Sequence, residues 1–534
     1  MSFELYVMQL LALMALSISA AYALSRYIAA LISGGRGRLW RIASLDPLLR
    51  FLLGPMYSRG MNWREYLTSL LALNGVVFAI DMALLMSQPL LGGPHISPDL
   101  AFNIASSFLT NTDLQHYAGV TTLTVASQML VITYTMFVAP ASGLAASFAF
   151  IRGIVRKGES LGNFYADFLR ISIALLLPLS LISSIILIAT GVPQAFQPGV
   201  VAAALQGGVR TIHLGPVASL ESIKLIGNNG GGYFAANSAY PFENPSGLSN
   251  FYEMFLMLLL PLSLPLAFGR LAGIRRGATL LGAMLAGMGA LVAIAFMGHV
   301  GAGVEPRLGA FDTVMFNAVS LATNTGATAS GLLAMSPQAI SSFLMAMFVQ
   351  AVPGSVGVGF MYLMVFVVIT LFVLGLMVGK APEMIGMKIS PRDIKLASAT
   401  FLVHPIVILL PLVAAFATGQ AQHLLGSPTP LSFTEVLYEF TSAAANNGSD
   451  YLGVAANAPF WNYATGLVML IGRYAPIALM MALAGSFAGK GGRQMPEPVE
   501  TQGVLFAVLL VGMTFLLTVL TFFPFLVLGP FSMG

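Results

Sequence analysis

The chain has 534 residues, of which 57% are hydrophobic and only 8% are Asp, Glu, Lys or Arg. Soluble domains carry about 25% charged residues, so 24 Lys and Arg with 20 Asp and Glu are too few to cover a chain of this length in water. The composition therefore predicts a protein that crosses the membrane many times. The net charge of +4 does not indicate a nucleic-acid-binding protein, and the absence of Cys excludes disulfides and thiolate sites.

Ten apolar segments are long enough to cross a membrane as helices, which takes about 20 mostly apolar residues each. The first is interpreted as a retained span, because no basic residue precedes it, Glu4 lies at its start and its apolar run is too long for a signal peptide. We therefore predict an all-α integral membrane protein with about ten transmembrane helices. The predicted spans cover residues 3–32, 65–88, 124–150, 167–190, 249–269, 277–300, 338–378, 399–418, 459–488 and 502–527.

Lys and Arg fall almost entirely in every second gap between these spans. Twenty of the 24 lie on one side and three, Arg210, Lys224 and Arg307, lie on the other, while Arg473 lies inside a span. Because cytoplasmic loops carry an excess of Lys and Arg, we expect both termini to lie outside the cytoplasm. The basic gaps contain Arg26, Arg36, Arg38, Arg41, Arg50, Arg59 and Arg64, then Arg152, Arg156, Lys157 and Arg170, then Arg270, Arg275 and Arg276, then Lys380, Lys388, Arg392 and Lys395, and finally Lys490 and Arg493.

The four remaining gaps share a repeated unit. Each contains a helix-length segment that is too short to cross the membrane and that ends in the pattern x-Asn-[Thr/Asn]-[Gly/Asp]. The Asn at the second position recurs at intervals of 117, 96 and 122 residues, so a unit of span, short helix, Asn-rich strand and span occurs four times. The short helices are predicted at 98–109, 217–226, 312–322 and 432–444, and the four tetrapeptides are Thr110–Asp113, Gly227–Gly230, Thr323–Gly326 and Ala445–Gly448.

This unit is typical of re-entrant loops that form a cation filter. Irregular backbone at membrane depth is tolerated only where protein buries it or water lines it. Four such strands around one axis would turn their carbonyl oxygens inward, where they replace the water shell of a cation. Glycine at the fourth position gives the backbone unusual freedom and leaves space on the axis. The predicted filter residues are Asn111, Thr112, Asp113, Asn228, Asn229, Gly230, Asn324, Thr325, Gly326, Asn446, Asn447 and Gly448.

The number of copies decides between a filter and a simpler explanation. A single Asn-Gly pair would be explained as a turn, whereas four copies in register with the spans favour the pore. The first copy has Asp113 where the others have glycine, with Gln115 two residues further on. We therefore predict a pseudo-symmetric pore whose ion sites need not match those of a homotetramer.

The segment after the second short helix carries a family resemblance. Residues 228–245, with the sequence NNGGGYFAANSAYPFENP, closely resemble the signature of the potassium-binding A subunit family of the Kdp potassium-transporting ATPases. The resemblance covers nearly the whole chain. The chain departs from the family pattern at Asn228, where Thr is usual, at Asn324-Thr325-Gly326, where Ser-Cys-Gly is usual, and at Val120, where Glu is common. Further matching segments are 61–67, 110–112, 375–383, 442–449 and 459–462.

The resemblance implies a channel-like subunit that selects K⁺ from outside the cell and delivers it to a catalytic P-type ATPase, the B subunit. It also implies C and small F subunits as partners, surrounding membrane lipid and a location in a prokaryotic inner membrane. K⁺ would be the only metal ion, bound by filter oxygens and transported. The residues next to the filter would be Thr110, Gln115, Gly231 and Gly232.

The sequence contains no feature of an enzyme that hydrolyses ATP. It has no G-x-x-x-x-G-K-[S/T] motif, no Asp-Lys-Thr-Gly motif and no large polar domain. We therefore predict no catalytic site and no ATP site in this chain.

Two features of the later spans are candidates for controlling ion exit. The predicted span 338–378 is interrupted by Pro353, Gly354, Gly357 and Gly359, which should break a helix. This break is either a kink between packed helices or an irregular segment below the filter that gates the pore. Arg473 is either a snorkelling or salt-bridged structural residue, or a charge that repels cations at the cytoplasmic end of the pore.

The remaining titratable residues give weaker indications. Asp113, Glu243 and Asp450 either raise the local cation concentration or are solvated loop carboxylates. None of the six His is assigned a site, because His95, His116, His213, His299, His404 and His423 show no metal-ligand spacing. Residues 489–494 are expected to form a cytoplasmic connector.

The sequence leaves two alternative functions to be compared with this prediction. An autonomous K⁺ channel or symporter of the Trk- or Ktr-like class would have the same four filter strands, whereas a membrane-embedded enzyme would need convergent titratable groups that the sequence does not indicate. The expected organisation is a first span and cytoplasmic linker (1–64), pore repeats at 65–150, 167–269, 277–378 and 399–488, and a last span at 502–534.

Overall fold

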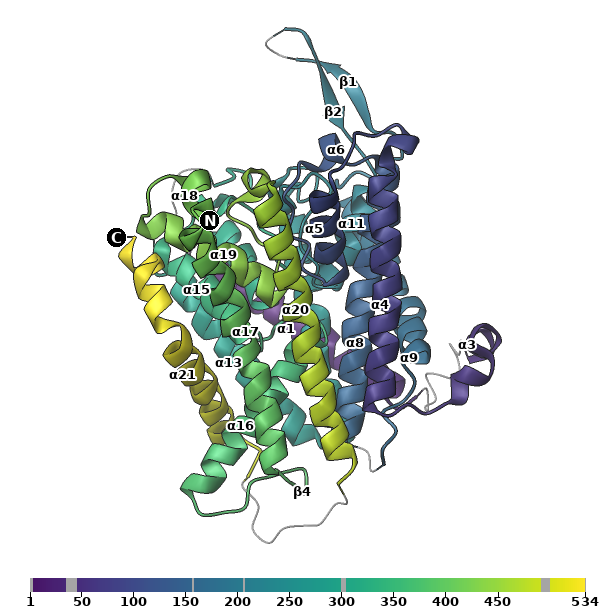
Figure 1. Ribbon diagram of the computed structural model, residues 1–534, viewed down its shortest axis with the longest axis vertical. Helices are drawn as coiled ribbons and strands as arrows, with labels where there is room; N and C mark the ends of the chain where they lie inside the picture. The colour runs from purple at the N-terminus through teal and green to yellow at the C-terminus, as the bar shows by residue number, and fades with distance from the viewer. Residues whose placement is uncertain are drawn as a thin grey trace.

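The computed structural model describes residues 3–34, 46–155, 158–204, 207–298, 304–490 and 500–533. Within them, ten helical segments are long and apolar enough to cross a membrane, which confirms the predicted number of spans (Figure 1). Predictions on Arg36, Arg38, Arg41, Arg156, Lys157, His299, Arg493 and most of the connector at 489–494 lie outside the described residues.

The spanning segments are helices of 20 residues or more, two of which contain a π-helical turn. They are α1 (Phe3–Ile32), α4 (Trp63–Met86), α7–η3–α8 (Val125–Ser127, Gln128–Thr133, Tyr134–Val155), α9–η4–α10 (Phe164–Ile171, Ser172–Leu176, Leu177–Ala189), α12 (Gly247–Ala272), α13 (Ile274–Ala295), α16 (Val358–Met377), α17 (Pro391–Ala417), α20 (Pro459–Ala488) and α21 (Val504–Leu528). Pro178, which has no N–H to donate, is the second residue after the second π-helical turn.

Four short helices lie between pairs of these spans, and they match the predicted short helices closely. They are α5 (Pro98–Leu109), α11 (Val217–Ile226), α14 (Gly309–Ala322) and α19 (Pro430–Ala445). Each is largely buried and each leads directly into one of the four tetrapeptides. The surrounding spans α8, α12 and α16 are also largely buried, whereas α1 and α21 pack on the outside against α12 and α13.

The predicted break in the seventh span is present. α15 (Pro337–Val349) ends at Val349, and α16 begins only at Val358, so eight irregular residues separate them. The smaller elements are α3 (Asp46–Leu53), η1 (Gly54–Ser58), η2 (Gln88–Leu91), α6 (Gly119–Thr122), η5 (Asn237–Ala239), η6 (Leu332–Ala334), α18 (Gln420–Leu425), η7 (Gly453–Ala456) and η8 (Pro530–Ser532).

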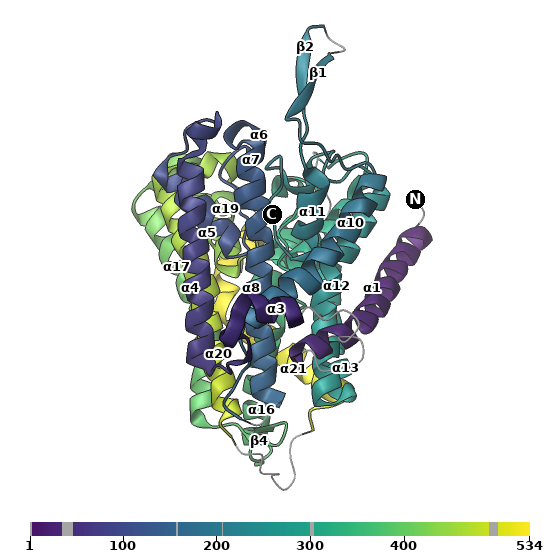
Figure 2. The same cartoon turned by 90° about the vertical axis from the view of Figure 1, so that its right-hand side faces the viewer.

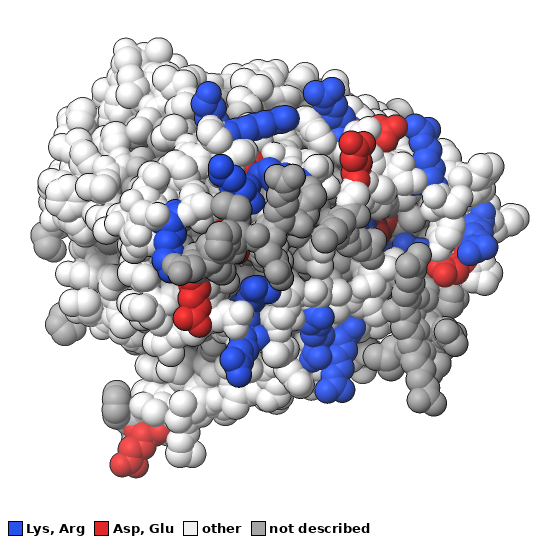
Figure 3. All heavy atoms as spheres, turned by 90° about the horizontal axis from the view of Figure 1, so that it is seen from below, with Lys and Arg blue, Asp and Glu red and all other residues white. Residues whose placement is uncertain are grey.

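Two short antiparallel hairpins, whose strands were not predicted from the sequence, lie at opposite ends of the bundle. β1 (Gly199–Ala203) pairs with β2 (Val209–His213), with Val201 opposite Thr211, and stands away from the helices (Figures 1 and 2). β3 (Glu383–Met384) and β4 (Met387–Lys388) lie at the other end. We call the end with β1 and β2 the hairpin end. The end with β3 and β4 is called the basic end, because Lys and Arg gather over this face in Figure 3. Both chain termini lie towards the hairpin end (Figure 1).

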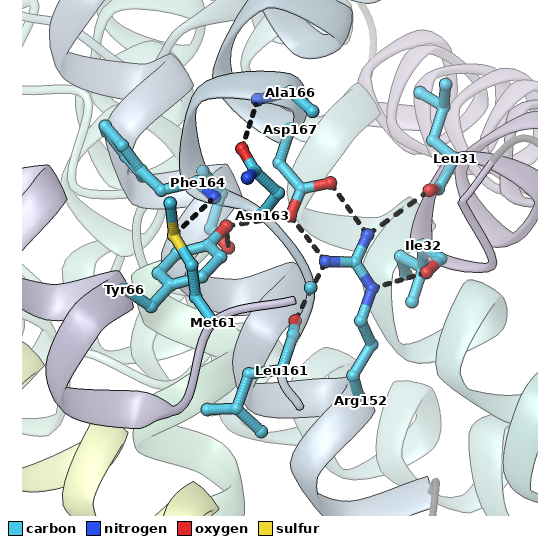
Figure 4. A network of polar contacts seen from close by, with 12 residues as sticks. Leu31, Ile32, Met61, Tyr66, Arg152, Leu161, Asn163, Phe164, Ala166 and Asp167 are labelled. Carbon is cyan, nitrogen blue, oxygen red and sulfur yellow. Dashed lines mark hydrogen bonds and ion pairs between the residues drawn. The ribbon is translucent and has the colours of Figure 1, made fainter. Parts of the chain in front are cut away.

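A buried ion pair joins four helices near the basic end (Figure 4). The Arg152 guanidinium from α8 forms a two-pronged contact with Asp167 of α9, with Nη2 2.8 Å from Oδ1 and Nη1 close to Oδ2. Its Nε also donates to the Ile32 carbonyl at the C-terminal end of α1, 2.6 Å away. The Tyr66 hydroxyl of α4 donates to the same Asp167 carboxylate at 2.9 Å. Arg152 therefore holds helices together inside the protein rather than lying in a solvated loop.

Candidate functional site: four strands around one axis

The four tetrapeptides lie together inside the bundle, although they are far apart in the sequence. All twelve predicted filter residues are buried. A Cβ atom added at Gly230 would lie 2.8 Å from the carbonyl oxygen of Thr325, 3.0 Å from that of Asn447 and 3.1 Å from that of Thr112. The middle carbonyls of the other three strands therefore surround Gly230. Only a residue without a side chain fits there, because a Cβ atom would occupy the space at the centre.

The same test shows that neighbouring strands lie in contact. A Cβ atom at Gly326 would come within 1.8 Å of the Asn447 carbonyl oxygen, and one at Gly448 within 1.8 Å of the Thr112 carbonyl oxygen. The third strand is thus next to the fourth, and the fourth is next to the first. The second strand also lies next to the first, since a Cβ atom added at Gly231 would lie 2.7 Å from the Asp113 carbonyl oxygen.

The strands share an unusual backbone conformation. The Asn at the second position has a positive φ in all four copies, and Asn tolerates this left-handed conformation better than most residues do. Alternation of left-handed and ordinary residues turns successive N–H groups to one side and leaves the carbonyls on the other. The four angles are 62° at Asn111, 48° at Asn228, 49° at Asn324 and 53° at Asn446.

The fourth position departs from the expectation in one copy. Gly326 (77°), Gly448 (97°) and the non-glycine Asp113 (60°) have a positive φ, as the interpretation of this position requires. In the second copy the positive φ falls one residue later, on Gly231 (66°). Gly230 is therefore required by the close approach of three carbonyls and not by its own φ.

Side chains link each strand to the next around the complete ring. The Asn111 amide donates to the Asn228 carbonyl at 2.6 Å, which joins the first strand to the second. The Asn228 amide donates to the Thr325 hydroxyl at 2.9 Å, and the Asn447 amide donates to Asn324 Oδ1 at 3.2 Å. The last link runs from the Asn446 amide to the Thr112 hydroxyl at 2.9 Å. The first and third strands also have a Thr pair at 2.7 Å, formed by Thr110 with Thr112 and by Thr323 with Thr325.

Two side chains of the first repeat bind the backbone of the second. Asp113 Oδ2 accepts a hydrogen bond from the Gly230 N–H at 2.9 Å. The Gln115 amide pairs with Gly232 in both directions, at 2.8 Å to its N–H and 3.0 Å to its carbonyl. Asp113 is fully buried, so the alternative of a solvated loop carboxylate is wrong for this residue.

Glu243 is also buried, and the solvated alternative is wrong for it too. Its Oε1 accepts from the Phe234 N–H at 3.0 Å, and its Oε2 lies 3.1 Å from Lys224 Nζ. Lys224 is 2.8 Å from the Glu221 carboxylate, one helical turn earlier on α11. Burial raises the pKa of Glu243 to about 8, although Lys224 opposes this shift. This network holds the glycine-rich segment that follows the second filter strand, and the i, i+3 spacing of Glu221 and Lys224 was its only sequence signal.

A buried histidine joins the first repeat to the fourth. His116 Nε2 lies 2.9 Å from Glu439 Oε1 on α19, and its Nδ1 lies 2.9 Å from Asn462 Oδ1 on α20. Burial disfavours the charged imidazole, but the Glu439 carboxylate outweighs burial and raises the His116 pKa. His116 shows no metal-ligand spacing, and no local pattern could indicate this role, because its partners are 323 and 346 residues away along the chain.

The predicted exit residues lie together beneath the third filter strand. The Gly354 N–H donates to the carbonyl of Ala322, the last residue of α14, at 2.9 Å. Gly354 and Gly357 have positive φ angles of 72° and 82°. An added Cβ atom would lie 2.7 Å from the Gly143 carbonyl oxygen of α8 at Gly357, and 2.6 Å from the Pro353 carbonyl oxygen at Gly359. The break is therefore a tightly packed segment that supports the filter from one side.

Arg473 reaches the same place from α20. Its side chain is only 4% exposed, and Nη2 donates to the Ala139 carbonyl of α8 at 3.3 Å. A Cβ atom at Gly143 would lie 2.7 Å from this Nη2, so Arg473 and the irregular segment meet at Gly143. No described Asp or Glu lies within ion-pair distance of it. Because the side chain is buried and has no carboxylate partner in the described part of the chain, the structure gives no support to a snorkelling or salt-bridged role.

A bundle with four buried helix-and-strand units around one ring of carbonyl oxygens defines a membrane protein of the pore-loop class. The family model described as "Potassium-transporting ATPase A subunit" matches residues 11–533, and the chain belongs to this family. ATP hydrolysis in such a complex belongs to the catalytic B subunit, and the other Kdp subunits are the partners of this chain.

Curated relatives agree over almost their full length. The potassium-transporting ATPase potassium-binding subunit of Geobacillus kaustophilus is 39% identical over 522 residues, 93% of each chain. The subunit of the same name from Alicyclobacillus acidocaldarius is 40% identical over 540 residues, 96% of each chain. Among solved structures, the potassium transporter TrkH from Vibrio parahaemolyticus has a TM-score of 0.56 at 16% identity, over 88% of this chain and 99% of that one. TrkH shows a shared fold, while the family match distinguishes this chain from an autonomous transporter.

Proposed function

We propose that the ring of strands is the K⁺ selectivity filter of an ATP-driven uptake pump. The observation that carries this proposal is the convergence of the Thr112, Thr325 and Asn447 carbonyls on the space beside Gly230. Carbonyl oxygens held around one axis replace the hydration shell of a dehydrated cation. The Asn and Thr side chains keep the oxygens in place, since they form hydrogen bonds from each strand to the next around the ring.

The segment at 353–359 and Arg473 are proposed to control the exit of the ion. Both lie against Gly143, beneath the third strand. A buried guanidinium with no carboxylate partner among the described residues repels a cation that passes the filter, because the charge is poorly screened inside the protein. This charge opposes leakage towards the basic end and diverts K⁺ sideways to the B subunit, with C and F subunits completing the complex.

The hairpin end is proposed to face the outside of the cell. Lys and Arg gather at the opposite end (Figure 3), and cytoplasmic loops carry this excess in membrane proteins. Both termini then lie outside the cytoplasm of a prokaryotic inner membrane. The four pore repeats are proposed at residues 65–150, 167–269, 277–378 and 399–488, with the remaining spans at the two ends of the chain.

Rb⁺ uptake at micromolar K⁺ in a bacterium without other K⁺ uptake systems tests this function. The chain is expressed alone and with its B, C and F partners. We expect uptake only with the partners, and we expect Gly230→Asp to abolish it. Gly289→Ala is the matched control, because an added Cβ atom at Gly289 meets no atom within 4 Å. Uptake by the chain alone would instead establish an autonomous channel or symporter.

A further inference from the structure

A cavity of about 220 Å³ lies next to the filter strands, with the final residues of two of them, Asp113 and Gly448, in its wall. The loops that follow all four strands complete the wall, so the cavity is bounded by every repeat. Its polar side chains come from Asp113, Gln115, Asn237, Thr328, Ser330, Asp450 and Tyr451. Two carboxylates line this space, and no Lys or Arg of the described residues does.

Oxygen atoms in this wall are left without partners. Asp113 is fully buried, and while Oδ2 accepts from the Gly230 N–H, Oδ1 has no hydrogen-bond partner among the residues that the structure describes. Asn237 Oδ1 is also buried without a described partner, although its amide donates to the Thr328 hydroxyl at 3.3 Å. A buried carboxylate oxygen without a donor is costly, so a ligand that supplies positive charge would stabilise it.

The second carboxylate is held in place by the backbone. Asp450 Oδ1 accepts a short hydrogen bond from the Gly453 N–H. Asp450 follows the fourth strand, so it faces the cavity from a different repeat than Asp113 does. The two carboxylates together attract a doubly charged ion about twice as strongly as a singly charged one at the same distance.

The size of the cavity favours an ion that keeps its waters over one that the protein coordinates directly. The described residues contain no group of three or more His, Asp or Glu placed to hold a metal ion directly. One water occupies about 30 Å³ in the liquid, so there is room here for a cation together with several of its waters. Mg²⁺ keeps several waters and is commonly bound through one or two carboxylates.

We propose that this cavity binds a hydrated divalent cation, and that the bound ion competes with K⁺ for entry to the filter. The inference rests on the proposed function, because competition requires that K⁺ enter through this end. A hydrated Mg²⁺ stops at the carboxylates, since it does not give up its waters readily enough to pass a ring of carbonyls.

The test measures Rb⁺ uptake by the complete complex in cells, with external Mg²⁺ varied from micromolar to millimolar. For the unaltered chain we expect Mg²⁺ to raise the apparent KM for Rb⁺ and to leave the maximal rate unchanged. Asp450→Asn keeps the oxygen that accepts from Gly453 and removes the charge. Measured at pH 8.5, where Asp450 carries its negative charge, this change should weaken Mg²⁺ inhibition roughly tenfold, the scale of one nearby charge.

Three further variants guard against a folding defect and against a general surface-charge effect. Gly331 lines the cavity, and an added Cβ atom there meets no atom within 4 Å. Gly331→Lys would place an ammonium group in the site and should abolish Mg²⁺ inhibition, whereas Gly331→Gln should retain it. Glu305→Gln removes a partly exposed carboxylate outside the cavity and should leave the inhibition constant unchanged.

The outcomes separate this inference from the function on which it rests. If Rb⁺ uptake does not need the partner subunits, the proposed function fails first. If uptake is normal but Mg²⁺ does not compete, or if Asp450→Asn and Gly331→Lys leave the inhibition unchanged, the divalent site is wrong and the filter proposal stands.

Discussion

The Asn228 side-chain amide donates a hydrogen bond to the Thr325 hydroxyl at 2.9 Å and so ties the second filter strand to the third. The same hydroxyl pairs with Thr323 at 2.7 Å within the third strand. One oxygen atom thus joins two repeats whose residues lie 97 positions apart. Rotation of either strand would break this link, which explains how carbonyls from separate repeats keep one spacing around an ion.

Thr325→Val should lower K⁺ affinity while leaving the fold intact. The change is close in volume but removes the hydroxyl, and each lost hydrogen bond costs about 1 kcal/mol. We expect the apparent KM for Rb⁺ to rise roughly five- to tenfold. Thr313→Val is the control, because among the described residues the Thr313 hydroxyl bonds only to the Gly309 carbonyl of its own helix. An equal rise in the apparent KM for both variants would contradict the idea that the Asn and Thr side chains of the ring hold the filter strands in place.

Arg473→Met should open a leak. Removal of the buried charge lowers the barrier to cations below the filter, so passive Rb⁺ flux should increase in proteoliposomes that contain the complete complex without ATP. Arg473→Lys keeps the positive charge, so its passive Rb⁺ flux should stay as low as that of the unaltered chain. Arg307→Met, at the hairpin end, controls for the loss of a positive charge elsewhere. Unchanged leak and unchanged coupled uptake in Arg473→Met would contradict a role for this residue in the exit.

Mg²⁺ inhibition should become stronger as the pH rises. Burial, together with the Glu439 carboxylate, raises the pKa of Asp450 to about 8, so Asp450 is mostly neutral at pH 6.5 and gains its negative charge as the pH approaches 8.5. His116, whose pKa is also raised, loses positive charge as the pH rises, which removes a charge that repels Mg²⁺ but also removes one that lowers the Asp450 pKa. The inhibition constant for Mg²⁺ should therefore fall between these two pH values.

The matching control is Asp450→Asn, whose inhibition constant should change far less with pH. Asp113, Glu439, Glu435 and Tyr451 are the other titratable groups around this residue, and they remain in the variant. If the inhibition constant falls with pH to the same extent in the unaltered chain and in Asp450→Asn, the titrating group is not Asp450 but one of these other residues.

Arg152→Met should destabilise the folded chain strongly. The change leaves the Asp167 carboxylate buried without its ion-pair partner, and breaking one side of a buried pair costs about 3–5 kcal/mol. It also removes the hydrogen bonds that Arg152 donates to the Leu31 and Ile32 carbonyls at the end of α1 (Figure 4). Thermal unfolding of the purified complex should show a clearly lower midpoint.

The exposed pair of Arg59 and Glu65 provides the comparison. Arg59 Nη2 lies 2.8 Å from Glu65 Oε1, but the two side chains are 62% and 39% exposed. Exposed ion pairs stabilise a folded protein by about 0–1 kcal/mol. Arg59→Met should therefore leave the midpoint nearly unchanged. A similar midpoint for both variants would show that the buried pair contributes little to stability.

The sequence by itself determined the spans and the position of each filter strand. Membrane crossing needs a long apolar run, and a short helix followed by x-Asn-[Thr/Asn]-[Gly/Asp] recurs four times, so both are local patterns. The same locality allowed the helix break at 353–359 to be predicted, because Pro and Gly act on their own backbone.

Only the tertiary structure decided how the strands meet. The bond from Asn446 to Thr112 and the pair of His116 and Glu439 each join residues more than 300 positions apart, and no local pattern encodes such a contact. The burial of Asp113 and the shift of the positive φ to Gly231 likewise follow from the approach of other strands. Propensity and spacing act along the chain, whereas oxygen positions around an ion depend on which backbones the fold brings within a few ångströms of one another.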